Sequence, residues 1–164
     1  MISYLKYYAQ LLKFRLSVTV VISALAGYLI GVTEFELTEL TLLIFGGFLV
    51  TGSANGFNQV LEKDYDKLML RTENRPLPLQ KIQPLNAVVF SFLIGLLGLY
   101  LLSLIKPHGS FYGYLSKSSA FGLLSLMIYV LSYTPLKRMS TVSIFVGAIP
   151  GAIPVMLGWV AATN

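Results

Sequence analysis

The sequence predicts an all-helical bundle embedded in a membrane. Hydrophobic residues make up 55% of the 164 residues, and the mean hydropathy is +0.74. Only 12 bases and 7 acids interrupt this composition, which is typical of an integral membrane protein and not of a soluble domain. The long uncharged stretches are apolar on all sides, whereas the strands of a membrane barrel would alternate apolar and polar positions.

Five uncharged windows are long enough to span a bilayer, which takes about 17 to 25 helical residues. They comprise residues 16–33, 40–61, 82–105, 118–136 and 139–164. The first window lacks a clear small-residue cleavage site and further spans follow it, so we expect an uncleaved helix. The second runs into a charged segment, and Lys81 and Lys106 bound the third. Pro135 should kink or end the fourth, and Trp159 in the fifth suits an interface anchor.

The charges of the connections predict the orientation. Ten of the 12 bases lie before the first window, between the second and third, or between the fourth and fifth. The two remaining connections carry Glu34, Glu36 and Glu39, or Lys106, His108 and Lys117. By the positive-inside rule, the N-terminus and the basic connections at 62–81 and 137–138 are cytoplasmic, so these connections lie on one side of the membrane.

The segment at 58–78 packs four acids and four bases together at the end of the second window. If the helix continues past the membrane edge, Asn58, Glu62 and Asp66 follow one another at single turns and share a face, whereas Asp64 points away. Two carboxylates and an amide oxygen suit Mg²⁺, which completes its shell with water and phosphate oxygens. The sequence therefore predicts a metal site here. The alternative is a solvated loop whose bases only fix the topology.

Arg71 and Arg75 follow this face and supply fork-shaped donors for an anion such as diphosphate. Thr72, Asn74 and Pro76 predict that the helix ends there, which would let the arginines turn back toward the metal.

The second basic connection adds Tyr133, Lys137 and Arg138 on the same side. These three side chains are candidates for binding the same anion. The alternative is an interfacial tyrosine followed by two bases that only fix the membrane topology. The run 147–154 places two glycines and two prolines inside the fifth window. We expect it to break the helical hydrogen-bond ladder, which a membrane protein tolerates only beside a cavity or buried in protein. The glycine pairs 27/31, 52/56 and 147/151 have the spacing of closely packed membrane helices.

Together these motifs resemble the UbiA superfamily of intramembrane prenyltransferases. The likeness rests on the series Asn58, Glu62, Asp66, Arg71-Thr72, Asn74-Arg75-Pro76, on Tyr133-Thr134-Pro135-Leu136-Lys137-Arg138, and on the 146–154 run ahead of Gly158-Trp159. Within the superfamily, the combination is similar to the branch that farnesylates haem b. The resemblance extends over nearly the whole chain.

The resemblance implies transfer of a farnesyl group from farnesyl diphosphate to a vinyl group of haem b, which makes haem O for terminal oxidases. Its implied metal ligands, and catalytic residues, are Asn58, Glu62 and Asp66 for Mg²⁺. The implied diphosphate-binding residues are Arg71, Arg75, Tyr133, Lys137 and Arg138, with Lys13 and Arg15 as weaker candidates. The implied setting is a bacterial-type cytoplasmic membrane. A haem-modifying oxidase is the expected downstream partner, and no nucleic acid is expected.

Two departures from the family pattern bear on these expectations. Glu62 stands where the superfamily usually has aspartate, which keeps the charge but lengthens its reach. The family bundle has nine helices and a second acidic motif, whereas residues 1–164 contain five windows and one acidic segment. We therefore expect a single prenyltransferase domain that lacks its C-terminal helices, is the N-terminal half of a longer enzyme, and is inactive alone.

Two other functions remain open from the sequence. Another enzyme of the superfamily, acting on a quinone precursor or a chlorin, would share the first acidic motif. A non-catalytic membrane subunit or half-transporter would use the basic connections to bind anionic lipids.

Overall fold

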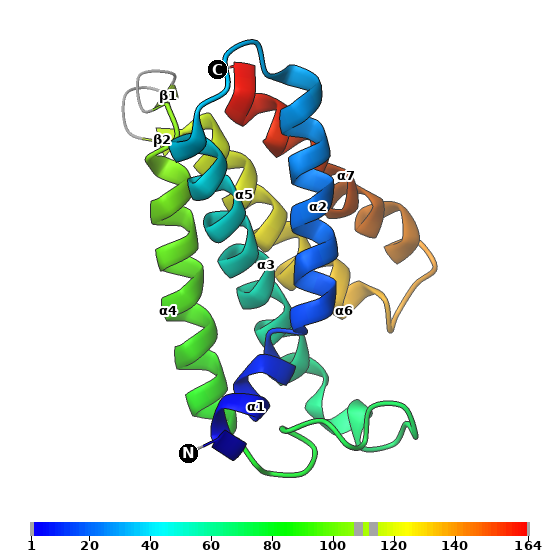
Figure 1. Ribbon diagram of the computed structural model, residues 1–164. Coiled ribbons are helices and arrows are strands. Elements are labelled where there is room, and N and C mark those ends of the chain that lie inside the picture. The colour runs from blue at the N-terminus through cyan, green and yellow to red at the C-terminus, as the bar shows by residue number, and fades with distance from the viewer. Residues whose placement is uncertain (1, 107–109, 112–114, 164) are drawn as a thin grey trace.

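The computed structural model describes residues 2–106, 110–111 and 115–163, and His108 lies outside these ranges. The helices form a single elongated bundle (Figure 1). Their bounds are α1 Ile2–Leu11, α2 Phe14–Gly31, α3 Leu37–Asp66, α4 Pro84–Ser103, α5 Lys117–Met127, η2 Ile128–Tyr133, α6 Thr134–Leu136 and α7 Ser143–Thr163. A short antiparallel pair, β1 Ser110–Phe111 and β2 Leu115–Ser116, joins α4 to α5.

Five helical segments of the described chain are long and apolar enough to cross a membrane, as the sequence predicts. Four of them are α2, α3, α4 and α7, and the fifth is the continuous run of α5, η2 and α6 over Lys117–Leu136. The 30 residues of α3 extend about 45 Å at 1.5 Å per residue, beyond the roughly 30 Å of hydrocarbon. The charged end of α3 therefore emerges from the membrane as a helix.

The backbones of α2 and α7 touch through glycines. A Cβ atom on Gly27 would collide with the Val155 carbonyl oxygen, and one on Gly158 would collide with the Ala24 carbonyl oxygen. Gly27 thus has the role expected of a small residue at a helix crossing. Gly147 is also closely packed, against the ring of Tyr133, whereas Gly151 differs from that expectation because it faces open space.

The N-terminal helix α1 was not predicted from the sequence. It meets α2 at a sharp elbow, where Lys13 adopts the left-handed conformation with φ of 47°. Two side chains of α3 hold this elbow in place by hydrogen bonds. The Gln59 amide donates to the Leu11 carbonyl over 2.6 Å, and the Asn55 amide donates to the Leu12 carbonyl over 3.3 Å. These bonds satisfy carbonyls that the end of α1 leaves without helical partners.

The prediction of a broken backbone in the fifth window is wrong. Helix α7 is continuous, with Pro150 and Pro154 inside it. A membrane helix tolerates proline where neighbouring protein covers the freed backbone groups, and Pro150 is buried in the bundle.

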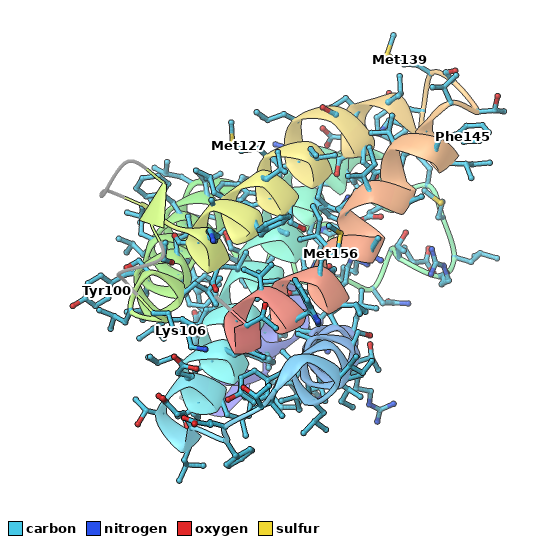
Figure 2. The ribbon with its side chains drawn as sticks, turned by 90° about the horizontal axis from the view of Figure 1, so that it is seen from above. Tyr100, Lys106, Met127, Met139, Phe145 and Met156 are labelled. Carbon is cyan, nitrogen blue, oxygen red and sulfur yellow. The ribbon has the colours of Figure 1, made fainter. Side chains whose placement is uncertain are left out.

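The far end of the bundle is held by a buried carboxylate. Glu39 is 7% exposed and lies 3.6 Å from the Lys106 ammonium, which also donates to the Ala162 carbonyl over 2.7 Å. Figure 2 shows Lys106 beside the end of α7. The basic segments lie at the opposite end, where α1 and the 67–83 connection come together (Figure 1).

Candidate functional site

One face of the emerging end of α3 carries the predicted oxygen ligands. Asn58, Glu62 and Asp66 are 1%, 7% and 2% exposed, because they point into the bundle. Asp64 points outward and pairs with Lys67 over 3.1 Å, with 69% of its side chain exposed. The helical spacing in the sequence thus separates the buried from the solvated carboxylates.

These three side chains face a cavity of about 500 Å³, which we call the basic pocket. It is lined by Lys13, Leu16, Asn58, Glu62, Tyr65, Asp66, Met69, Arg71, Thr72, Arg75, Tyr129, Tyr133, Lys137 and Arg138. Five of these lining residues are bases and two are acids. The pocket therefore carries an excess of positive charge, which favours an anion.

Both acids of the basic pocket already contact bases. Arg75 turns back from the 67–83 connection and donates to Asp66 over 2.7 Å. Glu62 pairs with Lys137 and lies 3.9 Å from Arg138. Each predicted metal-binding carboxylate is thus held by predicted phosphate-binding bases.

Helix α3 ends at Asp66, several residues before the Thr72–Pro76 stretch where the sequence reading placed its end. A series of turns replaces the expected helix, and the Thr72 hydroxyl donates to the Asp66 carbonyl over 3.1 Å. These turns return Arg75 to Asp66. Arg71 lines the basic pocket but stays exposed.

Lys13 reaches the site from the elbow between α1 and α2. Its ammonium donates to the Asn58 side-chain oxygen over 3.1 Å. Burial lowers the pKa of Lys13 from 10.5 to about 8, with Arg75 and Lys137 acting in the same direction and Glu62 and Asp66 opposing them. Arg15, the other weaker candidate, does not line the basic pocket and borders a neighbouring one.

The second basic connection closes the other side of the pocket. Arg138 donates to the Leu61 carbonyl over 2.8 Å, and its guanidinium lies 4.0 Å from the centroid of the Tyr65 ring. Lys137 lies 5.9 Å from the centroid of the Tyr133 ring. Residues far apart in the sequence thus converge around Glu62.

An apolar cavity of about 460 Å³ adjoins the basic pocket inside the bundle. Leu16, Tyr129 and Tyr133 line both spaces. Gly147, Pro150, Gly151 and Pro154 line the apolar cavity, as expected for the glycine-proline run. A polar pocket that meets an apolar cavity suits a molecule with an anionic head and a hydrocarbon tail.

Leu16, Tyr129 and Thr134 also contribute to the site, although the sequence patterns did not indicate them. The Tyr129 ring lies tilted against that of Tyr133 with 5.3 Å between ring centroids, and the Thr134 hydroxyl accepts from the Asn58 amide over 3.3 Å. The four-residue spacing of the two tyrosines could have indicated Tyr129. A leucine in an apolar window carries no such signal.

The donor set fits a hard cation such as Mg²⁺. Two carboxylates and the Asn58 amide oxygen provide oxygen ligands on one helical face, and the pocket has room for phosphate oxygens and water. Among the described residues, no group of three or more His, Cys, Asp or Glu residues is placed to bind a metal.

The fold and the pocket define a helical membrane protein in which a basic pocket joins an apolar cavity. The chain belongs to the UbiA prenyltransferase family, whose family model matches residues 20–164. It is 43% identical over 160 residues to the protoheme IX farnesyltransferase of Flavobacterium psychrophilum, covering 96% of this chain and 50% of that protein. It is 37% identical to the human mitochondrial protoheme IX farnesyltransferase, covering 95% of this chain and 33% of that protein.

A solved structure has the same architecture. It comes from work on the biosynthesis of digeranylgeranylglyceryl phosphate synthase in membranes, and it superposes with a TM-score of 0.82 at 26% identity, covering 98% of this chain and 54% of that one. The chain spans about half the length of the bacterial relatives that it matches.

Proposed function

We propose that this chain forms the diphosphate-binding half of an enzyme that transfers a farnesyl group from farnesyl diphosphate to a vinyl group of protoheme IX. The observation that carries the proposal is the junction of the basic pocket with the apolar cavity. The likeness to protoheme IX farnesyltransferases, at up to 43% identity, supports this acceptor over others.

In this proposal Asn58, Glu62 and Asp66 hold Mg²⁺, which supplies charge neutralisation for the departing diphosphate. The diphosphate oxygens are bound by the basic side chains that line the pocket. These are Arg71, Arg75, Lys137 and Arg138, with Tyr133 orienting the group and Lys13 at its edge. Binding would exchange the pairs Arg75–Asp66 and Lys137–Glu62 for contacts of each base with phosphate.

The reaction breaks the bond between the first farnesyl carbon and its diphosphate oxygen, and the electron pair leaves with diphosphate. The resulting allylic cation accepts the electron pair of a haem vinyl group. Water then adds to the cation left on the porphyrin side chain and loses a proton, which gives the hydroxyethylfarnesyl group. The bases stabilise the leaving group, while the apolar cavity keeps water from the allylic cation.

The orientation follows from the positive-inside rule, with the N-terminus and the basic pocket on the cytoplasmic side of the membrane. An enzyme placed there would take farnesyl diphosphate from the cytoplasm and haem from the bilayer. Its product would pass to a haem-modifying oxidase or to a terminal oxidase.

The test is formation of haem O by the full-length protein in membrane vesicles that contain haem b, farnesyl diphosphate and Mg²⁺, measured by mass spectrometry. We expect Asp66→Asn to lower the rate by at least about 10- to 100-fold, the loss that follows removal of even an outer-shell partner of a metal. Asp64→Asn, on the same helix but solvated, is the matched control and should keep full activity.

Two outcomes would favour the other candidate functions. Turnover of 4-hydroxybenzoate without turnover of haem would indicate an enzyme that prenylates a quinone precursor. A function that is retained in the Asp66→Asn variant and does not depend on Mg²⁺ would indicate a non-catalytic subunit or half-transporter.

A further inference from the structure

A third space, an open groove that we call the elbow pocket, lies between the α1–α2 elbow and the 67–83 connection. Its volume is about 760 Å³, and it shares Lys13, Leu16, Arg71 and Arg75 with the basic pocket. The two spaces are therefore neighbours with a common wall. The proposed binding of diphosphate does not involve Lys6 or Arg15, which line the elbow pocket but not the basic pocket.

The elbow pocket is lined by bases and by no acid. The bases are Lys6, Lys13, Arg15, Arg71 and Arg75. Within the described part of the chain, the carboxylates of the basic pocket contact Arg75, Lys137 and Arg138, whereas no ion pair involves Lys6, Arg15 or Arg71. This concentration of unneutralised positive charge creates a potential that attracts an anion.

The apolar residues that line the elbow pocket indicate what kind of molecule would bear the anionic group. Phe14 and Leu16 line the elbow pocket with 56% and 48% of their surface exposed. Leu16 also lines both the basic pocket and the apolar cavity. The three spaces thus meet at Leu16, and a molecule with an anionic edge in the elbow pocket can extend an apolar body toward the junction where the prenyl chain would react.

We propose that the elbow pocket is the acceptor's carboxylate site, where Lys6 and Arg15 bind the propionates of protoheme IX. The inference rests on the proposed function. A porphyrin carries its two propionates at one edge and its vinyl groups away from that edge, so anchoring the propionates beside the diphosphate directs a vinyl group toward the junction at Leu16. An anionic lipid head group has related chemistry but no group that must reach the junction.

The test compares Lys6→Gln/Arg15→Gln with the control Lys63→Gln/Lys81→Gln, which removes the same charge from bases that line neither pocket. The full-length protein is reconstituted in nanodiscs of neutral phosphatidylcholine. Binding of haem b, of haem b dimethyl ester and of a farnesyl thiodiphosphate–Mg²⁺ complex is titrated separately. In a further arm, the anionic lipid phosphatidylglycerol is added and its binding to each protein is measured.

We expect the Lys6/Arg15 variant to bind haem b about tenfold more weakly, as loss of two exposed charge contacts implies. Its affinity for the thiodiphosphate should be unchanged, because neither Lys6 nor Arg15, a weaker diphosphate candidate, lines the basic pocket. The dimethyl ester should bind the original and variant proteins equally. The control should match the original protein in all arms.

Equal haem affinity in both variants would overturn the inference and leave the proposed function intact. Loss of phosphatidylglycerol binding alone would reassign the pocket to a lipid head group. If the original protein bound the thiodiphosphate but no haem, both the carboxylate site and the proposed acceptor would be wrong. If it bound haem through Lys6 and Arg15 but no thiodiphosphate, the carboxylate site would stand and the proposed transfer would fail.

Discussion

Arg75 donates to the Asp66 carboxylate over 2.7 Å, although it lies nine positions further along the chain and α3 ends at Asp66. The Asp66 side chain is 2% exposed and that of Arg75 is 23% exposed. Arg75, a base expected to bind phosphate, is therefore ion-paired with Asp66, a carboxylate expected to bind the metal. The two substrate components, cation and anion, would have to enter together to separate this pair without leaving a buried charge unpaired.

This pairing predicts opposite effects of one substitution. Arg75→Gln should free Asp66 and strengthen binding of Mn²⁺ alone by several-fold. The same change should weaken binding of the farnesyl thiodiphosphate complex by about tenfold or more, since a charge-assisted contact is lost. Mn²⁺ electron paramagnetic resonance measures the first effect, and titration calorimetry measures the second. A parallel fall in both affinities would show that Arg75 only supports the fold.

The apolar cavity predicts control of prenyl length at Gly151. This residue lines the cavity, and a Cβ atom there would meet no other atom within 4 Å. Gly151→Leu should therefore fill part of the cavity without a backbone clash and shift the preference from farnesyl toward geranyl diphosphate. Gly47→Leu is the control, because its Cβ direction is equally open and it does not line this cavity. Competition between the two diphosphates in one reaction measures the shift.

The glycine contacts between α2 and α7 predict a strong effect on stability. Gly27→Ala would force a Cβ atom against the Val155 carbonyl oxygen, so the helices must separate. We expect a loss of about 1–3 kcal/mol, the usual range for overpacking. Gly151→Ala adds the same methyl group in the partner helix without a contact and should be neutral. Reversible unfolding in mixed micelles compares the two variants, and equal stability would contradict the close crossing.

The environment of Lys13 predicts an unusual titration. Because burial disfavours its charged form, Lys13 should lose its proton near pH 8, whereas an ordinary lysine does so at 10.5. Competitive acetylation followed by mass spectrometry measures the pKa of Lys13. In metal-free buffer, inorganic diphosphate should raise the pKa of Lys13, since a nearby anion favours the charged form. Its binding near pH 8 should then take up protons.

The sequence predicted the membrane spans and the buried face of α3 because both follow from regular periods. Uncharged length defines a span, and one-turn spacing placed Asn58, Glu62 and Asp66 together while it excluded Asp64. The loop charges placed Tyr133, Lys137 and Arg138 on the same side as these residues, and the family likeness implied diphosphate as the anion that they bind. The fold class, the spans and the family are confirmed, while the roles of the site residues stay predictions.

Features that depend on tertiary contacts were not accessible in this way. Helix α1 is only ten residues long, and its elbow at Lys13 is fixed by the side chains of Asn55 and Gln59 from another helix. The prolines of α7 looked like a break because local propensity cannot show that neighbouring protein covers the freed backbone groups. Leu16 gains its position at three cavities only from the way that the helices pack.

The π-helical turn η2 at Ile128–Tyr133 sets the angular phase between the membrane part of its helix and the basic connection that follows. A π turn carries one residue more than the α-helical turn it replaces. Converting it to α-helical geometry with the same residues would rotate everything beyond by about 100°. Lys137 and Arg138 would then swing away from Glu62, while the apolar face before the turn kept its register. The π conformation of this one turn thus links the orientation of the lipid-embedded helix to the charge balance of the pocket.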